Sequence, residues 1–257
     1  MSESGLDAQI QNYLRVAASR GRETERIGPF LATFTGRDPN PYLNYAIPDD
    51  GALPTSRDAS DLIAAFEQRS RTPRLEYITL LATGVEGPLL GAGFVEEGRL
   101  PLMVCVPGSE ARATAPEGIE LVMPQSDTEL LGLINAQNEA YGGEPNADLE
   151  AAARMRARID DGEIAILARD IETGEPAGGG VCTIPQGGMT EVAAIGVRPG
   201  FRRRGIAEAV TRRLASEAFK AGVTLAFLMA VHEAEARIYA RAGFSRVGEI
   251  LHISRPS

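Results

Sequence analysis

The sequence has 257 residues, of which 44% are hydrophobic and 24% are charged, as is typical of a globular protein with a buried core. A chain of this length forms one large domain or two of ordinary size. Its formal net charge of -9 argues against nucleic acid or an anionic membrane as the main partner. No apolar run approaches the roughly 18 residues that a membrane span needs, and the N-terminal residues lack the pattern of a signal peptide. We therefore expect a cytoplasmic protein, either a monomer or a homodimer.

The sequence contains two cysteines and two histidines. Cys105 and Cys182 lie in separate apolar runs, so we expect buried free thiols in a reducing compartment rather than a disulfide. Together with His232 and His252 they make no cluster with the spacing of metal ligands. We therefore predict no metal site.

Hydrophobic periodicity divides the N-terminal part of the chain into short elements. The spacing of apolar residues predicts helices over 6–19 and 56–69 and strands over 30–34, 42–47, 75–81 and 100–106. The segments between the first strands are dense in turn residues. Residues 108–118 are polar, aperiodic and rich in Pro, Gly and Ala. We take them as a linker between a domain at 1–107 and a domain at 119–257.

Helices and strands also follow one another in the C-terminal part. The same criteria predict helices over 130–141, 147–159, 205–220 and 232–242. They predict strands over 119–123, 163–169, 177–184, 189–197, 223–231 and 244–254. The strand over 223–231 is almost continuously apolar, which is typical of a strand covered on both faces.

The loop between the strand at 189–197 and the helix at 205–220 has the features of an anion site. Pro199 closes the strand because it has no N–H to donate to a sheet, and Gly205 allows a ligand to approach the backbone closely. The loop ends at a helix N-terminus, where unpaired N–H groups and the helix dipole favour an anion. Four arginines, at 198, 202, 203 and 204, add positive charge. This combination favours a diphosphate site over the alternative, an exposed arginine-rich helix cap.

The loop matches neither a Walker A sequence nor the motif Gly-x-Gly-x-x-Gly. It resembles the acyl-CoA loop of the GNAT superfamily of N-acyltransferases, which reads Arg/Gln-x-x-Gly-x-Gly/Ala after a strand ending near Val-x-Pro. Arg202, Gly205 and Ala207 stand at the loop positions, and Val197 and Pro199 precede them at the expected offsets.

A second segment, residues 232–244, resembles the family pattern Asn-x-x-Ala-x-x-Leu-Tyr-x-x-x-Gly-Phe. Tyr239 and the Gly-Phe pair at 243–244 match it. There are two departures, because His232 replaces the usual Asn and Glu235 replaces the usual Ala. The order of predicted elements over 119–257 is also similar to that of the GNAT fold. The resemblance implies an α/β (α+β) fold, with a mixed, mostly antiparallel sheet flanked by helices.

The two halves of the chain share short matches at one spacing. Ala-Gly-Phe at 92–94 recurs at 242–244, an offset of 150 residues, and strand-like and helix-like runs correspond at the same offset. We therefore predict a duplication, with the first GNAT-like domain degenerate, because Asp49 and Asp50 stand near the place of the arginine-rich loop and would repel a diphosphate. The alternative is an unrelated α/β domain. Either would serve as architecture, packing on the C-terminal domain and forming one wall of the substrate cleft.

The resemblance implies acetyl-CoA as the co-substrate. Backbone N–H groups of 203–206 would hold the pyrophosphate, and main-chain groups at 195 and 197 would pair with the pantetheine arm. A histidine at the place of the usual Asn can still donate a hydrogen bond to the pantetheine or adenosine side. The implied cofactor-binding residues are Ile195, Val197, Arg202, Arg203, Arg204, Gly205, Ile206, Ala207 and His232.

The resemblance also indicates which residues move protons. Tyr239 lies where the family's tyrosine meets the leaving thiolate, and a phenol with an ordinary pKa of about 10 can protonate it; the alternative is a packing tyrosine. Glu191 starts the strand that carries the cofactor, where many GNAT members have a glutamate near the acceptor amine. It is therefore our candidate general base, against the alternative of an exposed strand-end carboxylate.

Other residues are left open by the sequence. Glu139, Glu144 and Glu163 are alternative bases, and His252 is expected to be structural or exposed. The segment 141–143, Tyr-Gly-Gly, forms a plain turn or lines the acceptor site.

Two classes of function fit these features. The first is an acetyl-CoA-dependent N-acetyltransferase that acts on a small-molecule or protein amine. The second is a non-catalytic acyl-CoA-binding or regulatory module, since a fold can persist after its chemistry is lost. The presence of both the loop and the tyrosine in the C-terminal half favours the enzyme.

Overall fold

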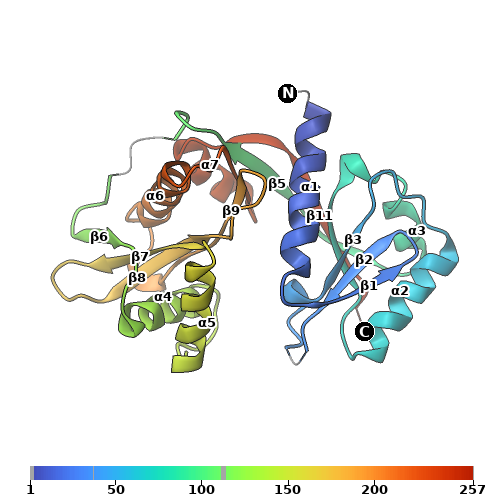
Figure 1. Ribbon diagram of the computed structural model, residues 1–257, viewed down its shortest axis with the longest axis horizontal. Coiled ribbons are helices and arrows are strands. Elements are labelled where there is room, and N and C mark those ends of the chain that lie inside the picture. Colours follow the sequence, from blue (N-terminus) through green and yellow to red (C-terminus); the bar gives the residue numbers. More distant parts are fainter. Residues whose placement is uncertain (1–2, 37, 111–113, 257) are drawn as a thin grey trace. The chain divides into compact units, whose positions relative to one another are not determined.

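The computed structural model describes residues 3–36, 38–110 and 114–256 (Figure 1). Residues 111–113 of the predicted linker therefore lie outside the described residues. The chain divides into two compact units, one made of Met1–Pro101 with Val247–Ser257 and the other of Leu102–Arg246. The boundaries of these units differ from those of the predicted domains, 1–107 and 119–257. In the described part of the chain, none of the helices combines the length and the apolar character that a membrane crossing needs.

The sheet of the second unit positions the candidate site. Its strands lie in the order β6-β7-β8-β9-β10-β5, and all neighbours are antiparallel except β9 and β10, which are parallel. The strands are β6 (Ile119–Val122), β7 (Ile164–Asp170), β8 (Pro176–Cys182), β9 (Met189–Val197), β10 (Leu225–Met229) and the C-terminal part of β5 (Val95–Cys105). The helices are α4 (Asp127–Ala140), α5 (Leu149–Asp160), α6 (Ile206–Lys220) and α7 (Glu233–Arg241). The predicted mixed, mostly antiparallel α/β fold is confirmed.

Helices cover both faces of this sheet because successive side chains of a strand point to opposite faces. On β7, Ile164 and Ile166 belong to the hydrophobic cluster that includes α6. Ala165 and Leu167, between and after them, belong to the cluster that includes α4 and α5. Figure 1 shows α4 and α5 on one side of β7 and β8 and α6 on the other.

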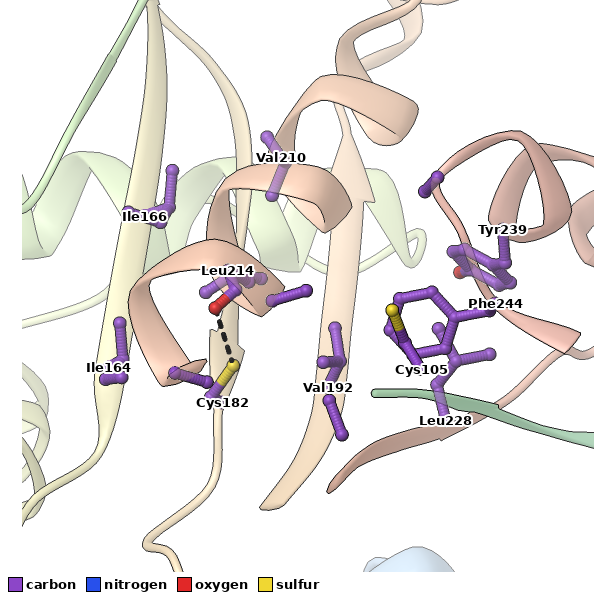
Figure 2. Packing of buried hydrophobic residues seen from close by; sticks show 14 of the residues in the cluster. Cys105, Ile164, Ile166, Cys182, Val192, Val210, Leu214, Leu228, Tyr239 and Phe244 are labelled. Atoms are coloured by element: carbon purple, nitrogen blue, oxygen red, sulfur yellow. Dashed lines mark hydrogen bonds between the residues drawn. The ribbon is translucent and has the colours of Figure 1, made fainter. Parts of the chain in front are cut away.

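The core on the α6 side extends to the residues around α7. Figure 2 shows Tyr239 and Phe244 packed near Cys105 and Leu228, which belong to the same cluster. Cys105 and Cys182 are both buried and free, as predicted. Burial raises the pKa of the Cys105 thiol to about 12, so it stays protonated and acts as a small apolar group.

In the first unit, five neighbouring strands of the sheet lie in the order β1-β2-β3-β4-β11. Its strands are β1 (Glu23–Ile27), β2 (Phe30–Phe34), β3 (Tyr45–Pro48), β4 (Arg74–Ile78) and the C-terminal part of β11 (Ser245–Ser254). Its helices are α1 (Glu3–Ser19), α2 (Ser56–Gln68) and the short α3 (Glu86–Gly91). Residues of α2 and of all five strands form its core, among them Phe30, Phe66, Leu75 and Leu251.

The two units share one strand arrangement, consistent with a duplication. In each, an antiparallel series leads to a parallel pair, β3 with β4 or β9 with β10, followed by an antiparallel strand. Ser56 begins α2, and Ile206 begins α6, 150 residues later. The final strand of each half has been exchanged: residues 250–254 of β11 pair with β4, and residues 102–105 of β5 pair with β10.

Several predicted elements of the first unit needed correction. The predicted strand 42–47 begins only at Tyr45, because Pro41–Leu43 form a 3-10 turn capped by the Asn40 side chain. The predicted strand 75–81 ends at Ile78, where a second 3-10 turn follows. The strand β1 was missed because four of its five residues, Glu-Thr-Glu-Arg, are polar, and α3 because it is short and contains Gly and Pro.

Candidate functional site

The parallel strands β9 and β10 separate where the candidate site begins. Pairing between them covers Met189–Glu191 on β9, whereas pairing of β9 with β8 continues to Val197. The register with β8 shifts near Ala194, whose φ of 52° lies in the left-handed region that non-glycine residues rarely adopt. The bulge turns the Ala194 carbonyl oxygen toward α4, where it accepts a hydrogen bond from Gln137 Nε2 at 2.9 Å. The edge of β9 after Glu191 is thereby available to another partner.

The loop after β9 folds into a concave main-chain turn. Residues Pro199–Phe201 make a 3-10 turn, Arg203 has a φ of 63°, and Gly205 has a φ of 78° and caps α6. Left-handed residues two positions apart bend the main chain sharply, and such a bend can aim successive N–H groups at an anion. The N-terminus of the 15-residue α6 adds its dipole. The loop therefore combines left-handed backbone with a helix N-terminus, and its role in binding a diphosphate stays a prediction.

A cavity of about 660 Å³ lies between this loop, β9, α7 and the C-terminal end of α4. From β9 come residues 195–197, and from the loop and α6 come Phe201–Arg203 and Gly205–Glu208. The remaining lining residues are Ala140, Tyr141, Val231, Glu235, Ile238, Tyr239 and Arg241. Of the predicted site residues, Ile195, Val197, Arg202, Arg203, Gly205, Ile206, Ala207 and Tyr239 are brought together here.

Tyr239 presents a protonated phenol to this cavity. The residue is 8% exposed. Burial, followed by the nearby Glu235 carboxylate and Tyr141, raises the pKa of its hydroxyl above the ordinary value of 10. The hydroxyl is therefore a proton donor at neutral pH.

Comparison with known proteins identifies the family of this segment. Residues 130–244 match the Acetyltransferase (GNAT) family, a range that contains every residue lining the cavity. The chain contains a domain of the GNAT superfamily. The search of curated proteins found no match to the chain.

Solved structures show how far the GNAT architecture extends along the chain. A GCN5-related N-acetyltransferase from Kribbella flavida superposes with a TM-score of 0.82 at 23% identity, covering 98% of this chain and 96% of that chain. One from Sphaerobacter thermophilus gives a TM-score of 0.67 at 18% identity over 89% of this chain and 78% of that one. A tandem GNAT protein from the clavulanic acid biosynthesis pathway gives 0.61 at 14% identity over 89% and 79%. At these identities the likeness concerns the fold.

The four arginines at 198, 202, 203 and 204, at the loop between β9 and α6, make different contacts. Arg198 forms ion pairs with Glu139 at 2.7 Å and Glu175 at 2.5 Å, which fix the end of β9. Arg202 donates to the carbonyl oxygens of Val197 and Ala140, both at 3.1 Å. Within the described residues, only Arg202 and Arg203 of these four arginines line the cavity.

Arg204 points elsewhere. Its guanidinium lies 3.9 Å from Asp170 and 3.5 Å from the Glu117 carbonyl oxygen, and it lines a separate hollow with them. The family resemblance implies a cofactor-binding role for Arg204, but its side chain lies outside the lining of the cavity.

Tyr141 reaches the freed edge of β9 from the end of α4. Its hydroxyl donates to the carbonyl oxygen of Ile195 at 3.0 Å. The approach depends on Gly196, because a Cβ there would lie 2.9 Å from Cβ of Ala140. The sequence left two interpretations of the segment 141–143, a plain turn or part of the acceptor site. Tyr141 of this segment lines the cavity.

Two further predicted site residues lie outside the lining of the cavity. Glu191, the candidate base, is half-buried on β9 before the bulge, and its backbone is hydrogen-bonded to Thr183. His232 is exposed at the N-cap of α7, where its carbonyl oxygen accepts from Glu235 N at 2.9 Å.

The alternative bases are also outside the lining. Glu139 is held by Arg198, and Glu163 is buried beside Arg158, with its pKa raised by burial against the opposing effect of that arginine. His252 lies in the first unit. The described residues contain no cluster of three or more side chains suited to a metal ion.

Proposed function

We propose that the chain is an acetyl-CoA-dependent N-acetyltransferase that transfers an acetyl group to a primary amine, either a small molecule or a protein amine. One observation carries this proposal. The anion-binding turn around Gly205 and the protonated phenol of Tyr239 line the same cavity, at the place where β9 and β10 part. A cofactor that carries a diphosphate and, at the end of its pantetheine arm, a thioester needs this combination.

The residues around the cavity fit acetyl-CoA. The N–H groups of the turn between Arg203 and Ile206 would hold the pyrophosphate, with Arg202 and Arg203 adding charge. The main chain of β9 at 195 and 197 would pair with the pantetheine arm as an added strand would. The carbonyl oxygens of both residues already accept hydrogen bonds, from Tyr141 and Arg202, and each keeps a second lone pair. When bound, acetyl-CoA supplies an activated thioester.

Proton movement is assigned to this chain's own groups. The Tyr239 hydroxyl gives its proton to the departing thiolate sulfur, a role that suits a phenol kept protonated by burial. Glu191 remains our proposed acceptor of the amine proton, and because it does not line the cavity, this role requires a bridging water. The first unit is proposed to be architectural. The loop of this unit that corresponds to the arginine-rich loop forms ion pairs within the unit. Asp49 pairs with Arg26, and Asp50 pairs with Arg15.

The proposal is tested by calorimetric titration with acetyl-CoA. A glutamate in place of Gly205 would clash with its left-handed φ and put a negative charge in the turn, so Gly205→Glu should abolish binding. Gly36→Glu is the matched control, because Gly36 lies in open space with an ordinary φ. Turnover of acetyl-CoA with an amine panel then separates an enzyme from the alternative, a non-catalytic acyl-CoA-binding module. Binding without turnover would favour that module, and absence of binding would refute both.

A further inference from the structure

The cavity contains a carboxylate at a position where the family pattern has alanine. Glu235 lies in the first turn of α7, one turn before Tyr239, so the two side chains share a face of the helix. Both line the cavity. One carboxylate oxygen of Glu235, Oε2, accepts the Val231 N–H at 2.9 Å, which fixes the direction of the side chain.

Among the residues that the structure describes, none forms an ion pair with Glu235. The other lining carboxylate, Glu208, forms ion pairs with Arg212 at 2.5 Å and with Arg241 at 2.7 Å. In the described ranges no lysine, arginine or histidine lies within ion-pair distance of Glu235. A partly buried carboxylate without a cationic partner costs desolvation energy that a bound cation would offset.

The surroundings of Glu235 suit an organic cation. Tyr239 and Tyr141 line the same cavity, and the Tyr141 side chain is accessible, with 65% of the residue exposed. A carboxylate together with phenol rings and hydroxyl oxygens is a set of groups that binds an ammonium ion. Of the lining arginines, Arg202 and Arg203 belong to the loop, whereas Arg241 of α7 is paired with Glu208. The loop thus offers positive charge to an anion, whereas α7 offers negative charge to a cation.

We propose that Glu235 selects a cationic amine as the acceptor by pairing with its ammonium group in the cavity. This inference rests on the proposed N-acetyltransferase function. Glu235 is a specificity-determining residue in this scheme. The Glu235 carboxylate would repel the diphosphate of acetyl-CoA, so its negative charge would not help to bind the cofactor. The bond from the Val231 N–H requires an acceptor oxygen but not a charge, since a Gln side-chain oxygen could also accept it.

The experiment compares two amines and two variants of the full-length protein. The probes are putrescine, which is dicationic at neutral pH, and aniline, which is neutral. Glu235→Gln keeps the acceptor for the Val231 N–H and removes the charge. Glu233→Gln is the matched control, because it removes a charge from the same first turn while its side chain lies outside the cavity lining and pairs with Arg246.

We expect Glu235→Gln to raise KM for putrescine about tenfold, the loss typical of one hydrogen-bonded charge pair, with KM for aniline unchanged. Calorimetric titration of putrescine into the protein without acetyl-CoA should show the same loss of affinity, and Glu233→Gln should behave as wild type. Equal effects on both amines, or no effect in the titration, would overturn the inference. If wild type acetylates neither amine, neither is its acceptor, and the proposed activity is decided by the amine panel. The putrescine titration still decides whether Glu235 binds a cation.

Discussion

The hydroxyl of Tyr141 donates a hydrogen bond to the carbonyl oxygen of Ile195 across 3.0 Å, at the edge of β9 that no longer pairs with β10. The proposed pantetheine arm would use this edge. The end of α4 is therefore tied to the strand that receives the cofactor, and the tie depends on the absence of a side chain at Gly196.

Removing this hydroxyl should strengthen cofactor binding. The arm must displace or share the Tyr141 hydrogen bond, and one such bond contributes about 0.5 to 1.5 kcal/mol. Tyr141→Phe should therefore lower Kd for acetyl-CoA by about twofold to tenfold in a calorimetric titration. Tyr42→Phe is a control, since Tyr42 is an exposed tyrosine of the first unit. Weaker binding by Tyr141→Phe would instead mean that the hydroxyl holds β9 in its receptive form.

Tyr239→Phe tests the proposed acid. The ring keeps its packing near Phe244 and Cys105, so cofactor affinity should change little. Without the proton donor, kcat should fall by about 10² to 10⁴. Steady-state kinetics and titration on the same preparation separate the two effects. Unchanged turnover would remove Tyr239 from the mechanism and leave it as a packing residue.

The exchange of final strands predicts which fragments fold. A fragment of residues 119–257 contains the matched family segment but lacks residues 102–105 of β5, which pair with β10. It should unfold at a lower temperature than a fragment of residues 102–246, because β10 would keep an unpaired edge and lose the contacts of Met103 and Cys105 in the core. Thermal unfolding followed by circular dichroism makes the comparison. Equal stability would show that this part of β5 contributes little to the second unit.

The sequence predicted the cofactor strand and loop well because their signals are local. The strand Met189–Val197 was predicted with the bounds it has, and α6 was predicted to within one residue. The exchange of β5 and β11 could not be predicted, because an apolar strand pattern does not specify its partner. The same holds for Glu235. The sequence identifies it as a departure from the family pattern, but its place beside Tyr239 and Tyr141 depends on how α7 and α4 meet β9.

The first unit should lose stability in mild acid through His252. Burial lowers the pKa of this imidazole from 6.5, with Glu76 and Glu97 raising it and Arg74 lowering it further. The geometry agrees, because Arg74 Nη2 lies 3.0 Å from Nδ1 and a guanidinium only donates, so Nδ1 must be unprotonated.

The unfolded chain therefore binds a proton at higher pH than the folded chain does. The neutral imidazole's contribution is fully present above about pH 6.5 and is lost progressively as pH falls toward the lowered pKa. Urea unfolding at about pH 8 and about pH 5 should show a smaller loss of stability on acidification for His252→Gln than for wild type. His232→Gln changes the other histidine, which is exposed, and should match wild type. If all three proteins lost the same stability on acidification, the loss would be due to carboxylates and not to His252.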